Sequence, residues 1–333
     1  MTLSSHVGHE RVVQQLATGA RTGRPAHAYL VTGPNGVGKR TLVRAFTASL
    51  LCDAPVAGDA CGTCAQCTRV AAGTHPDVLV VRRDEDRRDI RTEQARELTR
   101  WLTLRPLMAT RKVAVVDEAE RLNEHGQNAL LKSLEEPPGA AVLVLIATDP
   151  SLLLPTVRSR CLRLRLDPLP GTLVDRVLAE RGVAADVRAT IVSRAEGSPG
   201  RALALVDDPH HEAARRRMVD QLARLGGASA ADCSGVAQAL GRDDADVALE
   251  TALSWYRDLL GVLLDGPEAT VRNADAAQPL RDASARATVP HVLQALDVVC
   301  DTIRAVEGNA NRVLALETML LALRGIERTP AGE

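Results

Sequence analysis

The sequence predicts an α/β fold, a parallel sheet built around a phosphate-binding loop, followed by an all-helical region. Three observations carry this prediction. An apolar run, a glycine-rich turn with a lysine, and a helix pattern follow one another over residues 28–51. Two further apolar runs, 112–118 and 141–149, end in polar or acidic side chains, as parallel strands do at one edge of a sheet. From residue 210 to 328 the pattern is helical, with breaks at glycine and proline.

The bulk composition limits the classes of function. With 333 residues, the chain is long enough for two or three domains that each bury a core. The formal net charge is −1, so no overall positive field indicates nucleic-acid binding. Aromatic residues make up only 2% of the chain, which argues against a protein that binds single strands by base stacking. No signal-peptide pattern is evident, and no run approaches the roughly 20 apolar residues of a membrane helix, so we expect a cytoplasmic protein without membrane partners.

The first expected element is a helix over residues 3–22, with apolar side chains at helical spacing and Ser4 or Ser5 as its cap. A buried strand over residues 28–31 follows, and it leads directly into the glycine-rich turn.

The phosphate-binding loop spans residues 30–41. Its glycines, Gly33, Gly36 and Gly38, let backbone N–H groups converge on an oxyanion, and the N-terminus of the following helix adds a partial positive charge. Lys39 is in register to reach the outer phosphates of a nucleotide. A strand before the loop and a helix after it make this pattern more specific than glycines alone.

The loop departs from the usual pattern at one position. Serine or threonine normally follows the lysine and binds Mg²⁺, but here Arg40 follows it and the hydroxyl comes one residue later, at Thr41. One residue is about 100° of rotation on a helix, so we expect Thr41 to point away from the metal. Arginine carries no acceptor for Mg²⁺. The residues leave two alternatives open: a loop that holds ATP or ADP without hydrolysing it, and a loop kept for its turn geometry that holds none.

Four of the seven cysteines lie within sixteen positions, in the spacing C-x8-C-x2-C-x2-C. Thiolates at such intervals in a reducing compartment are typical ligands of tetrahedral Zn²⁺. We therefore expect a structural zinc site with no open position, formed by Cys52, Cys61, Cys64 and Cys67. The alternative is a set of free thiols in a loop. His75 is nearby, but we expect it to shape the entry to the next strand.

A strand over residues 78–81 and a solvated charge run over residues 82–91 come next, followed by a helix that Thr92 caps. The apolar run 112–116 then ends in Asp117 and Glu118. At the end of a parallel strand beside a phosphate-binding loop, Asp117 is expected to hold Mg²⁺ through water and Glu118 to orient the attacking water.

A helix over residues 119–136 is expected to end at the prolines that follow it. The strand 141–147 delivers Thr148 to the place where a γ-phosphate would lie. Residues 162–166 alternate leucine and arginine, which predicts a strand with one basic face.

At this point the chain resembles the bacterial clamp-loader subunits of the AAA+ class over nearly its whole length. The resemblance rests on Val7-Gly8-His9, His27-Ala28-Tyr29-Leu30, the four-cysteine module, the run from Asn128 to Pro138 and Ser159-Arg160-Cys161. It implies an AAA+ P-loop domain with the zinc module at residues 1–166, a small helical lid at residues 167–207 and a helical collar for oligomerisation at residues 208–333. In the collar, we expect Arg215-Arg216-Arg217 to form a solvated face, and Cys233 and Cys300 to lie in the core.

In this family, the arginine of the Ser-Arg-Cys motif reaches the γ-phosphate bound by a neighbouring subunit, so the resemblance implies that Arg160 is an arginine finger in trans. Motor subunits of the family also carry a sensing arginine, at the position where this chain has Gly200, with Arg201 displaced by one. The chain lacks the metal-binding hydroxyl and this sensor, yet keeps Lys39. It therefore resembles a stator-like member that gives a finger but does not hydrolyse ATP.

The resemblance further implies partners for the chain. They are gamma/tau and delta subunits in a hetero-oligomeric ring, the sliding β clamp and, through the complex, primer–template DNA near the nucleoid. The chain would be a subunit of a DNA polymerase holoenzyme, itself neither polymerase nor active ATPase. Two rivals stay open: an autonomous gamma/tau-like ATPase, and a zinc-dependent DNA-binding protein with an inactive ATPase domain.

Overall fold

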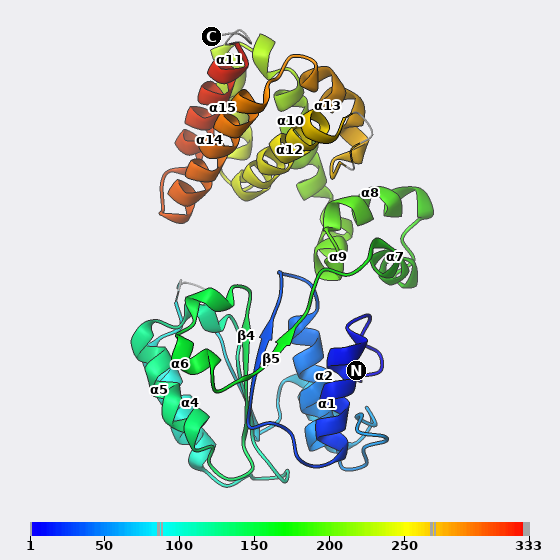
Figure 1. The fold of residues 1–333 in the computed structure, drawn as a ribbon, viewed down its shortest axis with the longest axis vertical. Coiled ribbons are helices and arrows are strands. Elements are labelled where there is room, and N and C mark those ends of the chain that lie inside the picture. The colour runs from blue at the N-terminus through cyan, green and yellow to red at the C-terminus, as the bar shows by residue number, and fades with distance from the viewer. Residues whose placement is uncertain (1, 85–86, 88, 267–268, 270, 329–333) are drawn as a thin grey trace. The chain divides into compact units, whose positions relative to one another are not determined.

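The computed structural model describes residues 2–84, 87, 89–266, 269 and 271–328 (Figure 1). Contacts divide the chain into two compact units. Unit 1 comprises Met1–Val177 and Gly197–Arg201, and unit 2 comprises Leu178–Glu196 and Ala202–Glu333. The predicted lid, residues 167–207, therefore contributes residues to both units, and the three-domain division stays a prediction.

Unit 1 is built on a five-stranded sheet in which all pairings are parallel, as predicted. The strands are β1 (Ala28–Thr32), β2 (Val78–Val81), β3 (Val113–Val116), β4 (Val142–Ala147) and β5 (Leu162–Arg165), in the order β2-β3-β4-β1-β5. Thr32 at the end of β1 lies opposite Ala147 at the end of β4. Val116 at the end of β3 lies opposite Leu145 of β4. The register therefore brings the segments that follow these three strands to one edge of the sheet.

Helices cover both faces of this sheet. They are α1 (Glu10–Arg21), α2 (Lys39–Leu51), α3 (Ala65–Ala72), α4 (Thr92–Thr103), α5 (Glu124–Glu135) and α6 (Pro155–Arg158), with short 3-10 turns η1 (Ala119–Arg121) and η2 (Pro150–Leu152). Side chains of β1 alternate between two cores. Tyr29 and Val31 pack with α1, α2 and α3, whereas Ala28 and Leu30 pack with α4, α5 and α6. Figure 1 shows α1 and α2 on one side of the sheet and α4, α5 and α6 on the other.

Two predicted helices have different bounds in the structure. The helix predicted over residues 3–22 begins only at Glu10, because Gly8 (φ 74°) and His9 (φ 58°) adopt left-handed conformations that a continuous helix cannot contain. Glycine is favoured at position 8 by this positive φ, and a Cβ atom there would also lie 2.5 Å from a methyl carbon of Leu169, which would have to shift. The helix predicted over residues 119–136 is split into η1 and α5, and the Asn123 side chain caps α5 by accepting from the Gly126 N–H at 2.8 Å.

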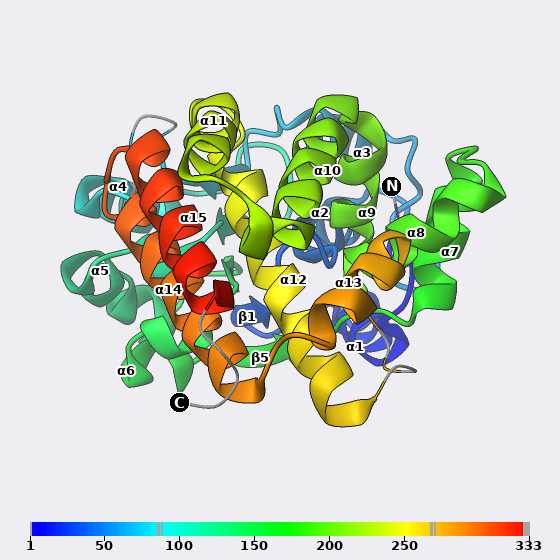
Figure 2. The same cartoon turned by 90° about the horizontal axis from the view of Figure 1, so that it is seen from above.

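Two further elements, α7 (Gly171–Glu180) and α9 (Pro199–Asp207), contain residues of both units. Unit 2 is otherwise helical, as predicted, with a core of its own. Its elements are α8 (Ala185–Ala195), α10 (Pro209–Ala223), η3 (Leu225–Gly227), α11 (Ala230–Leu240), α12 (Ala245–Asp265), η4 (Ala274–Ala276), α13 (Ala277–Ser284), α14 (Val289–Glu307) and α15 (Arg312–Arg328). The long helix α12 buries Trp255 and Tyr256 in the core, and Figure 2 shows α14 and α15 side by side. Cys233 is fully buried, as expected, whereas Cys300 is only partly buried.

The expected solvated arginine face is wrong for Arg215, whose side chain is 4% exposed. Arg215 pairs with Asp275 and lies 3.4 Å from the Glu212 carboxylate, which also pairs with Arg194 of α8. Burial alone would raise the pKa of Glu212, but Arg194 and then Arg215 lower it to about 2. These charges are held inside unit 2 by their partners.

The charge cluster formed by Glu212, Arg194, Arg215 and Asp275 should make the stability of unit 2 sensitive to acid. A carboxylate whose folded pKa is depressed stabilises the fold fully above its unfolded pKa of 4.5, and this stability is lost as the pH falls toward 2. We expect Glu212→Gln to lower the free energy of unfolding at pH 7 by about 1.5–3 kcal/mol and to flatten its dependence on pH below 4.5. Denaturant unfolding of the full chain between pH 2 and 7 measures both. Asp220→Asn, on the exposed side of α10, is the control; equal pH profiles for the two variants would contradict the assignment.

In the part of the chain that the structure describes, no helix is both long and apolar enough to cross a membrane. Residues 85, 86 and 88 of the predicted charge run lie outside the described residues.

Candidate functional site

The phosphate-binding loop has the conformation that its glycines predict. Gly33 (φ 148°), Gly36 (φ 74°) and Gly38 (φ 106°) all lie in the region that other residues rarely adopt. Gly33 also allows close packing, since a Cβ atom there would lie 2.2 Å from the backbone oxygen of Leu166. Helix α2 begins at Lys39 directly after the loop, so its N-terminal N–H groups face the site.

Lys39 binds the loop itself. Its side chain is buried, and its Nζ donates to the backbone oxygens of Gly33 (2.5 Å) and Pro34 (2.9 Å) and to Oγ1 of Thr148 (3.4 Å). Burial lowers the pKa of Lys39, and the nearby carboxylates of Glu120 and Asp117 oppose that effect. In the structure, the lysine therefore donates its hydrogen bonds to backbone carbonyls of the loop. It lies at the place where a phosphate would be expected.

Arg40 pairs with both acids that follow β3. Its Nε lies 2.6 Å from Oδ2 of Asp117, and its Nη2 lies 3.1 Å from Oε1 of Glu118. Asp117 is 8% exposed, and the second oxygen of Glu118 pairs with Nε of Arg83 at 3.0 Å. Hydrogen bonding to Asp117 raises the pKa of Arg40, so the guanidinium stays charged. Arginine carries no acceptor for Mg²⁺, and the structure adds that the charge of Arg40 is paired with Asp117, expected to hold Mg²⁺, and with Glu118, expected to orient the attacking water.

A cavity of about 410 Å³ adjoins the loop and brings together residues that lie far apart in the sequence. Its lining includes Gly36, Gly38, Lys39, Arg40, Thr41, Asp117, Glu118, Thr148 and Gly200. Oγ1 of Thr148 donates to Oδ1 of Asn35 at 2.9 Å, so the polar end of β4 is bound to the loop. The structure thus places nearly all the predicted nucleotide-binding residues around one cavity, and their role in binding stays a prediction. Arg160 does not line it.

The segment that should carry the sensing arginine closes over the loop instead. The Gly200 N–H donates to the backbone oxygen of Gly36 at 2.8 Å, and Ser198 Oγ donates to the backbone oxygen of Asn35 at 3.0 Å. A Cβ atom at Gly200 would lie 2.9 Å from both Cα and O of Gly36. No side chain fits at position 200 without a shift of the loop. The resemblance to motor subunits predicts that the arginine is missing here, but the sequence did not predict the contact of Ser198 with Asn35, because it joins segments 163 residues apart.

Arg160 lies in the connection between α6 and β5. Its guanidinium donates to the Thr156 oxygen at 3.0 Å and pairs with Oε1 of Glu135 at 2.7 Å. The side chains of Arg160 and Glu135 are 35% and 50% exposed, so the pair is in contact with solvent. An exposed ion pair contributes roughly 0–1 kcal/mol, which leaves Arg160 free to exchange Glu135 for another anion.

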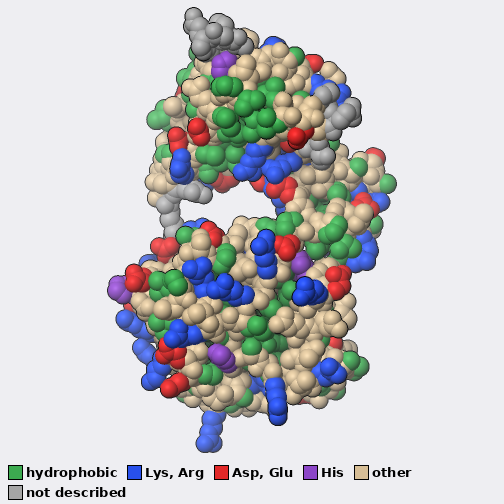
Figure 3. All heavy atoms as spheres, viewed as in Figure 1, with side chains coloured by type: hydrophobic (Ala, Val, Ile, Leu, Met, Phe, Trp, Pro, Cys, Tyr) green, Lys and Arg blue, Asp and Glu red, His purple; other side chains and the backbone are tan. Residues whose placement is uncertain are grey.

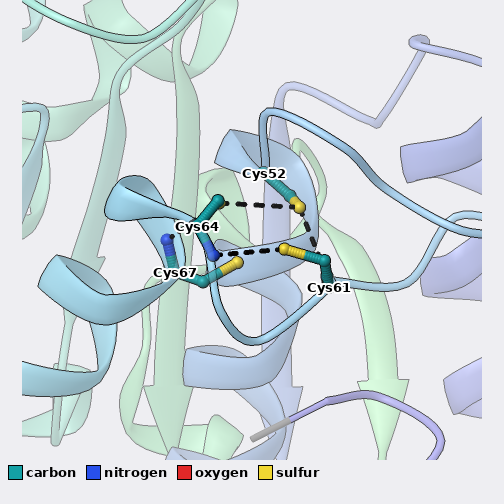
Figure 4. Close-up of side chains that lie close together, drawn as sticks. All are labelled: Cys52, Cys61, Cys64 and Cys67. Atoms are coloured by element: carbon teal, nitrogen blue, oxygen red, sulfur yellow. Dashed lines mark hydrogen bonds between the residues drawn. The ribbon is translucent and has the colours of Figure 1, made fainter.

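The four predicted metal ligands meet in one cluster (Figure 4). The sulfur atoms of Cys52, Cys61, Cys64 and Cys67 all lie within 4.8 Å of one another, and those of Cys52 and Cys64 are 3.9 Å apart. Zn–S bonds of about 2.3 Å in a tetrahedron place sulfur atoms about 3.8 Å apart. Cys52 follows the last residue of α2 and Cys64 caps α3, so two helix ends position the cluster. The residues present fit a metal with thiolate ligands.

Hydrogen bonds around the cysteines favour thiolates at some positions. The N–H groups of Cys61 and Cys64 donate to Sγ of Cys52 and Cys61, respectively, both at 3.3 Å. Hydrogen bonds from Thr63 and Cys64 lower the pKa of Cys61 to about 6, while burial raises the pKa of Cys52 and Cys67. A bound cation would offset that burial effect.

His75 is not part of this cluster, as expected. Its Nδ1 accepts from the Asp77 N–H at 3.0 Å, and its Nε2 therefore donates to Oε1 of Gln66 at 2.8 Å. The Asp77 carboxylate in turn accepts three backbone N–H groups from residues 107–109. His75 shapes the start of β2.

Comparisons with known proteins agree with one another. Residues 8–170 match the family model described as DNA polymerase III, delta subunit. The chain is 35% identical to DNA polymerase III subunit delta' of Pseudomonas aeruginosa over 305 residues, which cover 89% of this chain and 91% of that protein. It is 33% identical to the delta' subunit of Escherichia coli over 60% of each chain. The tau/gamma subunit of Haemophilus influenzae is 37% identical over 54% of this chain, but only a quarter (25%) of that protein is covered.

A gamma subunit-related protein from Thermotoga maritima aligns with 94% of this chain and 100% of its own, at 18% identity and a TM-score of 0.49. The family assignment depends on the sequence relatives, because the match to the Pseudomonas protein spans both chains almost end to end. The chain belongs to the family of DNA polymerase III delta' subunits.

Proposed function

We propose that this chain is the stator-like delta' subunit of a bacterial sliding-clamp loader. It would give Arg160 to the ATP site of a neighbouring motor subunit while its own site does not hydrolyse ATP. The observation that carries this proposal is the pairing of Arg40 with both Asp117 and Glu118, which engages the two carboxylates that hydrolysis requires. Arg160, in contrast, does not line the cavity beside the phosphate-binding loop, and its ion-pair partner Glu135 is exposed. The close packing of Gly200 on the backbone of Gly36 supports the same division of roles, because it leaves no room for a sensing arginine at position 200.

The proposed partners follow from the family. Gamma/tau and delta subunits would complete a hetero-oligomeric ring, which would grip primer–template DNA and load the β clamp in the cytoplasm, next to the nucleoid. Contact of this chain with DNA would be limited to phosphates. Figure 3 shows basic side chains on the visible face of unit 1 interspersed with acidic ones, in keeping with the net charge of −1. The polymerase activity would belong to other subunits of the holoenzyme.

Assembly is the first experiment. The chain is mixed with gamma/tau and delta subunits and separated by size-exclusion chromatography. The proposal expects one complex that contains all three, whereas an autonomous ATPase would hydrolyse ATP without them. Failure of the chain to enter a complex would contradict the proposal.

The metal is proposed to be Zn²⁺ in a structural role, held by Cys52, Cys61, Cys64 and Cys67. The four sulfurs would fill a tetrahedral shell, leaving no position for a reacting water. Nucleotide, ATP or ADP, is proposed only as a ligand that is not turned over.

Removing the metal should destabilise unit 1, because the residues between Cys52 and Cys61 have few buried apolar side chains of their own. We expect Cys64→Ser, or a strong chelator, to lower the free energy of unfolding on the order of 5 kcal/mol. Cys300→Ser, in α14 of unit 2, is the matched control. Metal content and thermal unfolding of the purified chain test this.

The same chelation experiment distinguishes the proposal from the second rival, a DNA-binding protein that depends on zinc. A zinc-dependent DNA-binding protein would bind duplex DNA as an isolated chain, lose binding in the chelator and show steep salt dependence. The proposal expects a loss of stability and no such binding.

A further inference from the structure

The loop between the first two cysteines has a defined shape. Val56 and Asp59 exchange two backbone hydrogen bonds of 2.9 Å around a two-residue turn, Ala57 (φ 52°) and Gly58 (φ 87°). Gly58 packs directly on α1, where a Cβ atom would lie 2.2 Å from the Ala17 oxygen. The loop of residues 53–60, here called the cysteine loop, is therefore fixed against α1 as well as to the cysteines on either side.

Asp59 of this loop binds the N-terminal residues. Its Oδ1 accepts from the Leu3 N–H at 2.7 Å, and its Oδ2 accepts from the Ser4 N–H at 2.8 Å. The same carboxylate accepts from Ser49 Oγ of α2 at 3.2 Å and from the Ala60 N–H at 2.7 Å. Hydrogen bonds to an ionised acceptor are among the strong ones. One carboxylate thus joins the N-terminal residues, the cysteine loop and the helix that follows the phosphate-binding loop.

From Asp59 the N-terminal segment crosses the phosphate-binding loop. The imidazole of His6 packs on Gly38, where a Cβ atom would lie 2.9 Å from Cε1 of His6. His9 Nε2 then lies 2.8 Å from the backbone oxygen of Asp167, and Gly8 packs against the side chain of Leu169. Residues 3–9, here called the N-terminal strap, therefore run from the cysteine loop over Gly38 to the segment that follows β5.

We infer that Asp59 is a positioning residue: it ties the N-terminal strap to the cysteine loop and thereby couples metal binding to the conformation of the phosphate-binding loop. The coupling, but not the tether itself, rests on the proposed metal site. The metal would fix Cys52 and Cys61 and so the ends of the cysteine loop. Asp59 passes that constraint to Leu3 and Ser4, and His6 passes it to Gly38.

His6 provides a local reporter for this contact. Burial, and then the neighbouring His9 at a ring distance of 5.7 Å, lower the pKa of His6 to about 4. Among the residues that the structure describes, its buried Nε2 has no hydrogen-bond partner. If the strap leaves Gly38, water reaches the ring and its pKa should move toward 6.5.

The test uses the full chain and two readouts in wild type, Asp59→Ala and Asp53→Ala. Asp53 is the matched control: it is an exposed acid of the same cysteine loop, and its carboxylate accepts from Gln66 Nε2 at 3.3 Å. Amide hydrogen exchange is followed over residues 2–9 and 33–41, and the pKa of His6 is measured by NMR. Metal content is measured for each protein.

We expect Asp59→Ala to keep its metal but to exchange about tenfold or more faster in both segments, with the pKa of His6 raised. Asp53→Ala should match wild type. Equal exchange and equal His6 pKa in the two variants would overturn the tether. Should Asp59→Ala fail to fold, Ser4→Pro removes one N–H donor while Asp59 stays in place, and should give the same direction of change; its failure to do so would overturn the tether as well.

Chelation separates the coupling from the metal assignment. In wild type, removal of the metal should accelerate exchange over residues 2–9 and 33–41, and in Asp59→Ala it should add little over residues 33–41. If the wild type contains metal but chelation does not change its amide exchange over residues 33–41, the coupling alone is overturned. A purified wild type without metal would overturn the proposed zinc site and the coupling, whereas the comparison of Asp59→Ala with Asp53→Ala would still decide the tether.

Discussion

Arg160→Ala is expected to slow ATP hydrolysis about 10³-fold at the one motor site that receives this side chain. A guanidinium supplied from outside neutralises charge on the phosphoryl group in the transition state, and alanine supplies none. The fold should not change, because the partly exposed guanidinium of Arg160 makes an exposed ion pair with Glu135 and hydrogen bonds only to nearby Thr156 and Ser159 among the contacts of the described residues. Single-turnover hydrolysis by the assembled ring, with an excess of ring over ATP, measures the effect.

Two variants make this result specific. Arg163→Ala removes another exposed arginine, from β5, and should leave hydrolysis unchanged. Arg160→Lys keeps the charge but loses the planar, two-pronged donor, so it should recover only part of the rate. An Arg160→Ala ring that assembles normally and hydrolyses ATP at the wild-type rate would rule out the finger.

Arg40→Thr is expected to give the chain a magnesium-dependent affinity for ATP that the wild type lacks, with binding at least about tenfold tighter in Mg²⁺. The substitution frees Asp117 and Glu118 from the guanidinium and supplies the missing hydroxyl directly after Lys39. Isothermal titration with and without Mg²⁺ measures it. Turnover should stay low, because no side chain fits at position 200.

Arg40→Ala is the control for this experiment, since it removes the guanidinium without adding a hydroxyl, and should bind less tightly than Arg40→Thr. Without nucleotide, both variants should unfold more easily than wild type, because the nearly buried Asp117 loses its partner. If Arg40→Thr binds Mg²⁺ and ATP no better than wild type, the ion pair of Arg40 with Asp117 and Glu118 is not what prevents magnesium-dependent ATP binding.

The sequence was sufficient for the parts of this molecule that depend on local pattern. The parallel sheet, the phosphate-binding loop and the convergence of the four cysteines are all as predicted, because strand periodicity, glycine positions and cysteine spacing are local signals. The identity of Arg40 already predicted that the Mg²⁺ site of the loop is incomplete. Its pairing with Asp117 and Glu118 could not be derived in that way, because it joins side chains about 80 residues apart and depends on where the ends of β3 and α2 meet.

The predictions that were wrong share a cause. The first helix was expected from residue 3, but it begins only at Glu10, after Gly8 and His9 adopt left-handed conformations where Gly8 packs on Leu169, 161 positions away. Arg215 was expected in solvent, but Asp275 and Glu212 neutralise it inside unit 2. Leu169 and Asp275 cannot be identified from the local pattern, although Glu212 lies only three residues before Arg215 on the same helix. The same holds for Asp59, whose bonds to Leu3 and Ser4 span more than 50 residues. Tertiary contacts that override local preference are the part that the sequence does not disclose.

ATP turnover by the isolated chain, compared with turnover after addition of gamma/tau and delta subunits, is the most direct test of the central claim. We predict no magnesium-dependent turnover by the isolated chain, and turnover in the ring that depends on Arg160. Hydrolysis by the purified chain on its own, at a rate comparable to that of the ring, would contradict the account.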